Sequence, residues 1–125
     1  MSKFLRITRH PVLPAAEDWL RAKFGIDLEI VTMDVAFGDD PIGTVARLAA
    51  EVGEVVAAEV VAPLPILARL LGARSEITFP LLRAEFKRDA TGRLIVAGTD
   101  EAGRAVFAFD RYVRLIRVSI ETAEL

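Results

Sequence analysis

Apolar residues follow two alternating patterns along the first two thirds of this chain. Short runs that are β-branched or alternate with polar residues are typical of strands. These runs lie at residues 3–8, 27–32, 55–61 and 76–82. Between them, apolar residues recur at helical spacing after Pro14, after Pro41 and at residues 66–71, and a glycine follows each of these segments. The pattern therefore predicts the order β-α-β-α-β-α-β, which implies right-handed crossovers and a parallel sheet.

The richest apolar stretch, residues 55–71, is the centre of this prediction. It begins as a β-branched run, which is typical of a strand covered on both faces, and then turns at residues 63–65 into a short helix. We interpret it as a central strand and its following helix.

The pattern changes after residue 82. Turn-forming sequences at residues 89–92 and 98–103 separate three further strand-like segments. These segments lie at residues 93–97, 104–109 and 112–121. We expect one domain over residues 1–125, with a parallel α/β half (1–82) and an antiparallel C-terminal β-meander (83–125) that extends the sheet or forms a dimer interface.

The predicted fold class is α/β, a small three-layer domain with a mainly parallel sheet. This layout resembles that of flavodoxin-like and Rossmann-like domains, and it also looks like that of ligand-sensing domains that bind cyclic oligonucleotides as dimers. The resemblance concerns topology alone, so it assigns no role to any residue.

Composition narrows the functional classes. Hydrophobic residues make up 53% of the chain, but charged residues interrupt every apolar run before it reaches the length of a membrane span. Residues 1–6 carry charges where a signal peptide has an apolar segment, so we expect a cytoplasmic protein without membrane contact. The formal net charge of −2 gives no reason to expect binding to duplex nucleic acid.

The chain lacks cysteine, asparagine and glutamine altogether. The absence of cysteine excludes disulfides and thiol chemistry. The absence of all three resembles the composition of thermophilic proteins, although a GC-rich genome gives a similar bias.

The strongest candidate site follows the first strand. Thr8, Arg9 and His10 place a hydroxyl, a guanidinium and the only histidine just before a predicted helix. Ligands of open parallel sheets lie beyond the carboxyl ends of the strands, arginine binds anions, and histidine exchanges protons near neutral pH. The remaining predicted ligand-binding residues are Pro63, Leu64, Pro65 and Arg83. The alternative interpretation is that residues 8–10 form a surface turn whose polar side chains are only solvated.

Several conventional sites are missing from the sequence. It contains neither a G-x-x-x-x-G-K-[ST] loop nor a G-x-G-x-x-G sequence after the first strand, and it has no G-x-S-x-G elbow. With one histidine and no cysteine, a metal would depend on carboxylates, and capping of the helix after Pro41 already explains Asp40. We therefore expect no metal and no cofactor.

Glu59 interrupts a strand that should be buried on both faces. One interpretation makes it an acid or base in a pocket, and the other pairs it with an arginine or places it at an edge or interface. We favour the structural interpretation.

Three functional hypotheses follow. The first is a homodimeric binding or sensor domain for a small anionic ligand, a nucleotide or phosphate compound, contacted by Arg9 and His10. The second is a metal-independent phosphodiesterase or nuclease that acts on a nucleotide in the same crevice, with His10 as the catalytic acid or base. The third is a structural or interaction module that binds no small ligand.

Overall fold

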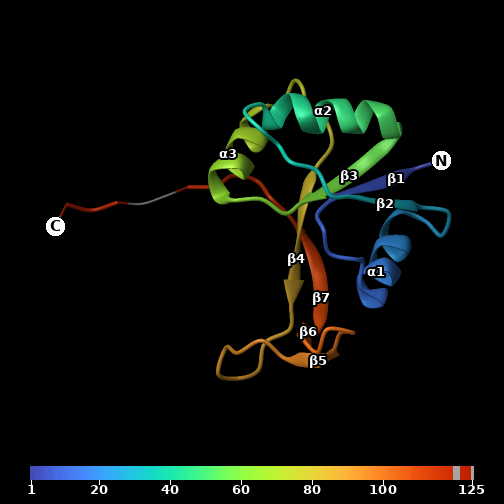
Figure 1. Cartoon of the computed structure of the whole chain (residues 1–125), viewed down its shortest axis with the longest axis vertical. Coiled ribbons are helices and arrows are strands. Elements are labelled where there is room, and N and C mark those ends of the chain that lie inside the picture. Colours follow the sequence, from blue (N-terminus) through green and yellow to red (C-terminus); the bar gives the residue numbers. More distant parts are fainter. Residues whose placement is uncertain (120–121, 125) are drawn as a thin grey trace.

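The computed structural model describes residues 1–119 and 122–124 and contains a five-stranded sheet between helices (Figure 1). The strands of this sheet are β1 (Lys3–Ile7), β2 (Glu29–Met33), β3 (Val55–Val60), β4 (Leu81–Phe86) and β7 (Phe109–Arg114). The helices that connect the first four strands are α1 (Pro14–Phe24), α2 (Pro41–Val52) and α3 (Leu64–Gly72). A separate antiparallel hairpin consists of β5 (Val96–Thr99) and β6 (Ala105–Phe107).

The strand order of the large sheet is β2-β1-β3-β4-β7. β1 is parallel to both β2 and β3, and β3 is parallel to β4, whereas β7 is antiparallel to β4. The predicted α/β fold with a mainly parallel sheet is thus confirmed, and its first four strands have the order of a flavodoxin-like sheet. The chain adds β2 on one side of β1 and β3 on the other, so the strand order reverses between β1 and β3.

Successive side chains of β1 point to opposite faces of the sheet, so this strand contributes to the core on both faces. Phe4 packs on one face of the sheet with Leu20 of α1, while Leu5 packs on the other face with Val45 of α2 and Leu70 of α3. Figure 1 shows α1 apart from α2 and α3, on the other side of the sheet. All five side chains are at most 1% exposed. Each such burial stabilises the fold by roughly 1.5–3 kcal/mol before the loss of chain entropy.

The helix ends follow the predicted start and stop residues. Asp40 is the N-cap of α2 and accepts a hydrogen bond from the backbone N–H of Gly43 at 2.9 Å, with Pro41 in the first turn. Gly53 ends α2 at a φ of 76°, a left-handed conformation that glycine adopts without strain. Within the described residues, none of the helices is long and apolar enough to cross a membrane.

The fourth strand begins later than the apolar run at 76–82 suggests. After α3, the backbone N–H groups of Glu76 and Ile77 both donate to the carbonyl of Ala73, at 3.2 and 2.9 Å, which forms a turn. Ile77 is buried in the α2–α3 side of the core instead of continuing a strand. β4 therefore starts at Leu81, and residues 83–86 extend it.

The antiparallel C-terminal part is present, and it is divided between two sheets. β4 pairs directly with β7, and β5 pairs with β6 as a hairpin beyond them (Figure 1). Three backbone hydrogen bonds join the two parts in a ring: Lys87 donates to Ala108 at 2.8 Å, Ala108 to Ile95 at 2.8 Å, and Ile95 to Lys87 at 2.9 Å. In a simple meander, these backbone groups would instead pair each strand with the next one along the chain.

The segment predicted as a last strand at 112–121 is shorter in the structure. β7 ends at Arg114, and Leu115 donates a final backbone hydrogen bond to Leu81 at 2.8 Å. Leu115 and Val118 then pack against the α2–α3 side of the core without strand structure. Residues 120 and 121 of this prediction lie outside the described residues.

Candidate functional site

Three of the predicted site residues lie together in a crevice of about 260 Å³. Thr8, Arg9 and His10 follow β1 and form one wall. The crevice lies where the carboxyl ends of β1, β2 and β3 meet, beside the point at which the strand order reverses. Open α/β sheets bind their ligands at this position.

Backbone hydrogen bonds hold the loop after β1 in place. The N–H of Thr8 donates to the carbonyl of Met33 at 2.9 Å, and the N–H of His10 donates to the Thr8 hydroxyl at 3.2 Å. Nη1 of the buried Arg6 side chain also donates to the His10 carbonyl, at 3.0 Å. Thr8 is buried by this arrangement, whereas Arg9 and His10 are exposed. The loop therefore has a fixed backbone and presents two side chains to solvent.

Four further residues that line the crevice were not among the predicted ligand-binding residues. Asp34, Val35 and Phe37 follow β2, and Val61 follows β3. The Phe37 carbonyl accepts a hydrogen bond from the Thr44 hydroxyl of α2 at 3.3 Å, which ties this loop to the helix. Asp34 and Val35 come soon after the predicted strand at 27–32, and this was the available signal, because residues there lie at the ligand-binding edge.

The other predicted ligand-binding residues do not line this crevice. Pro63 is the N-cap residue of α3, where its carbonyl accepts from the N–H of Ile66 at 3.0 Å, and Leu64 and Pro65 form the exposed first turn of this helix. Arg83 is exposed on β4, with Nη2 at 3.4 Å from a carboxylate oxygen of Glu85. The crevice thus brings together the residues after β1 and none of these four.

A buried polar network supports the floor of the crevice. Glu59 accepts hydrogen bonds from Nε of Arg6 at 3.0 Å and from the hydroxyl of Tyr112 at 2.8 Å. Nη1 of Arg6 also donates to the Thr32 hydroxyl at 3.0 Å, as well as to the carbonyl of His10. Arg6, Glu59 and Tyr112 are 5%, 7% and 6% exposed. This confirms the structural interpretation of Glu59, whose charge is paired with an arginine.

The network also determines the protonation state of Tyr112. Burial raises the pKa of its phenol well above the usual range, and the nearby Glu59 carboxylate raises it further. Within the described residues, every buried side-chain nitrogen and oxygen has a hydrogen-bond partner. The network therefore holds no free polar atom for a ligand, and its contribution is to fix β1, β3 and β7 against one another.

The side chains that line the crevice differ in chemical type. In the part of the chain that the structure describes, no group of three or more histidine and carboxylate side chains is placed to hold a metal ion. Arg9, His10, Thr8 and Asp34 give the crevice one cation, one titratable imidazole, one hydroxyl and one carboxylate. Comparison of the chain with protein-family models, with curated proteins and with solved structures finds no match.

Proposed function

We propose that this chain is a binding or sensor domain for a small anionic ligand, a nucleotide or other phosphate compound, held in the crevice after β1. The observation that carries the proposal is the exposed pair Arg9 and His10 on a backbone fixed by hydrogen bonds, at the point where the strand order reverses. A guanidinium there offers paired donors to a phosphate.

Asp34 favours a nucleotide over a bare phosphate. Asp34 lines the same crevice as Arg9, and its negative charge would repel an inorganic anion bound beside it. A carboxylate accepts hydrogen bonds from ribose hydroxyls, which is the role of an acidic residue in dinucleotide-binding sheets. In this proposal Arg9 contacts the phosphate, Asp34 contacts the sugar, and the apolar side chains of Val35 and Phe37 contact the base.

The volume of the crevice limits the size of the ligand. At about 260 Å³ it is slightly smaller than typical small-molecule sites, which measure roughly 300–1,000 Å³. This favours a mononucleotide, or one nucleotide of a larger ligand, over a whole dinucleotide.

Titration calorimetry with AMP, adenosine and inorganic phosphate tests the proposal. AMP should bind more tightly than either of its parts, and Arg9→Ala should weaken AMP binding at least about tenfold, because a hydrogen bond to a charged group contributes about 1.5–3 kcal/mol. The melting temperature of this variant should be unchanged, since Arg9 is exposed. Arg69→Ala, which removes an exposed arginine of α3 outside the crevice, is the matched control.

Equal losses of AMP affinity in the two arginine variants would contradict the proposal. So would an Arg9→Ala variant whose stability and affinity fall together, because the residue would then act through the fold. A ligand at one hundred times its Kd should add about 2.7 kcal/mol to the free energy of unfolding, so thermal shift can extend the search to cyclic oligonucleotides and sugar phosphates.

Catalysis in the same crevice is the second candidate, because His10 lines it beside Arg9. As a general acid or base, the imidazole would assist hydrolysis of a phosphodiester bond. Turnover of a bound nucleotide that persists unchanged in His10→Ala would exclude this role.

We further propose that the domain acts as a homodimer through its C-terminal part. All four residues of β5 are exposed, Val96 among them at 54%, and β7 is the last strand of the sheet order. Unpaired strand edges and exposed apolar side chains favour association with a second copy. Analytical ultracentrifugation should detect a dimer, and a monomer at every accessible concentration would refute this part of the proposal.

A further inference from the structure

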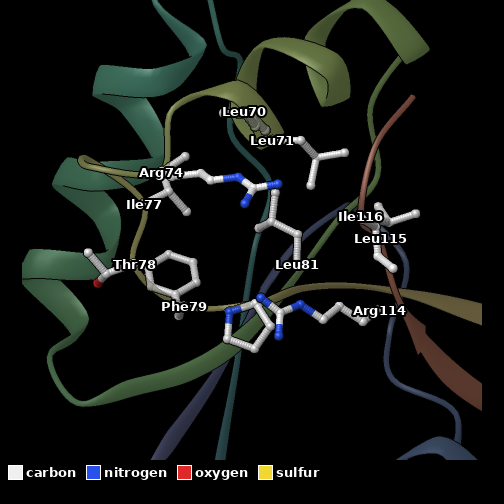
Figure 2. Close-up of a pocket in the computed structure, with 11 residues that line it drawn as sticks. Leu70, Leu71, Arg74, Ile77, Thr78, Phe79, Leu81, Arg114, Leu115 and Ile116 are labelled. Carbon is white, nitrogen blue, oxygen red and sulfur yellow. The ribbon is translucent and has the colours of Figure 1, made fainter. Parts of the chain in front are cut away.

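A second cavity lies beside the start of β4 and the end of β7. It measures about 380 Å³ and is formed by the end of α3, the connection into β4 and the residues at the end of β7 (Figure 2). It shares no residue with the crevice. The two cavities can therefore be perturbed independently.

Apolar atoms contribute about half of the surface of this cavity. Leu71, Phe79, Leu81, Leu115 and Ile116 surround the space shown in Figure 2. Ile116 is 69% exposed and adds apolar surface at the rim of the cavity. These five side chains favour contact with the hydrocarbon part of a ligand.

Two arginines give the cavity its charge. Figure 2 shows the side chains of Arg74 and Arg114 extending into the cavity from opposite walls, with Leu81 between them. None of the lining residues is acidic. Among the residues that the structure describes, neither guanidinium has a carboxylate partner. Two cations beside an apolar surface attract an anion, and guanidinium groups bind carboxylates with paired hydrogen bonds.

We propose that this cavity binds a small amphipathic carboxylate, an acyl acid with a hydrocarbon chain of medium length. Both Arg74 and Arg114 attract the carboxylate, which binds beside Leu81, and the chain packs against Leu71, Phe79 and Ile116. The cavity volume equals that of about a dozen water molecules at ~30 Å³ each, which limits the ligand to a single acyl chain of medium length. A nucleotide is disfavoured because Thr78 is the only uncharged polar side chain among the lining residues.

Titration calorimetry with decanoate tests the proposal, with decanol as the uncharged probe of equal chain length and acetate as the head group alone. Decanoate should bind at one site per chain, and more tightly than both decanol and acetate. Arg74→Gln and Arg114→Gln should each weaken decanoate binding at least about tenfold. Both arginines are exposed, so the melting temperatures should not change.

Arg111→Gln is the matched control, because Arg111 lies on β7, is exposed and does not line the cavity. Equal loss of affinity in this variant would overturn the proposal, since it would indicate attraction to net charge alone. Decanol binding as tightly as decanoate would also overturn it, as would the absence of saturable binding. AMP affinity should be unchanged in Arg74→Gln, which separates this site from the crevice.

Discussion

Neutralising Glu59 should destabilise the fold by about 3 kcal/mol, because Arg6 then remains buried without a counter-charge. The side chains of Arg6 and Glu59 are only 6% and 9% exposed, and their charged atoms are 3.0 Å apart. Arg6 cannot turn easily towards water, since Thr32 and the His10 carbonyl also hold its guanidinium at 3.0 Å. Breaking a buried pair from one side costs about 3–5 kcal/mol, and Glu59→Gln lies at the low end because glutamine can still accept from Tyr112.

Urea unfolding followed by the fluorescence of the only tryptophan measures this loss. Trp19 packs against Tyr112 with ring centroids 5.5 Å apart, so its emission should report the unfolding of this part of the core. With a denaturant slope of ~1.5 kcal/mol/M, a loss of about 3 kcal/mol lowers the urea midpoint by about 2 M. Glu85→Gln, which removes one partner of an exposed ion pair on β4, should change stability by less than about 1 kcal/mol.

A double-mutant cycle separates the ion pair from other effects of the substitution. Arg6→Met combined with Glu59→Gln leaves no unpaired buried charge, so the double variant should be more stable than Glu59→Gln alone. The expected coupling is about 2 kcal/mol. A Glu59→Gln variant that loses less than about 1 kcal/mol, with additive effects in the cycle, would refute the argument that this buried pair is strongly coupled.

Two further predictions concern pH and helix capping. Tyr112 is the only tyrosine, so ultraviolet absorbance of the phenolate reports it alone, and the folded protein should keep it protonated above pH ~10, where the unfolded chain ionises. Because of the raised pKa, the folded state retains a proton that the unfolded state loses. The free energy of unfolding should therefore fall above pH ~10 by up to about 1.4 kcal/mol per pH unit. A phenol that titrates near pH 10 in the folded protein would contradict this prediction. Asp40→Ala should lower the stability measured by urea unfolding by about 1 kcal/mol, because it removes the hydrogen bond to the N–H of Gly43. Asp39→Ala is its control, and equal losses in the two variants would show that the cap bond contributes nothing.

The sequence predicted the parallel half well, because helix ends and strand composition there depend on neighbouring residues in the chain. Asp40 and Pro41 begin α2 through their own backbone chemistry, and the β-branched run from Val55 forms the strand that its composition favours. The start of β4 was predicted too early, because the turn after α3 depends on the carbonyl of Ala73 and on burial of Ile77 in the core. Apolar composition alone does not distinguish a strand from a buried turn.

Tertiary pairing explains what the sequence could not indicate in the rest of the chain. β4 pairs with β7, which lies more than twenty residues further along, and no local pattern marks that choice. The same limit applied to the candidate site. Thr8, Arg9, His10 and Asp34 were predictable from their places after β1 and β2, whereas the contribution of Phe37 depends on how the loop after β2 folds. The cavity at Arg74 and Arg114 joins two distant segments and has no local signature.

An amide-resolved nuclear magnetic resonance titration of the folded chain with AMP tests whether the crevice is the ligand site, because it locates binding as well as detecting it. We expect saturable shifts at the residues that line the crevice, with the largest near Arg9 and Asp34, and with the resonances of Arg74 and Arg114 unchanged. Saturable shifts that cluster away from the crevice, or no shifts at millimolar AMP, would contradict it.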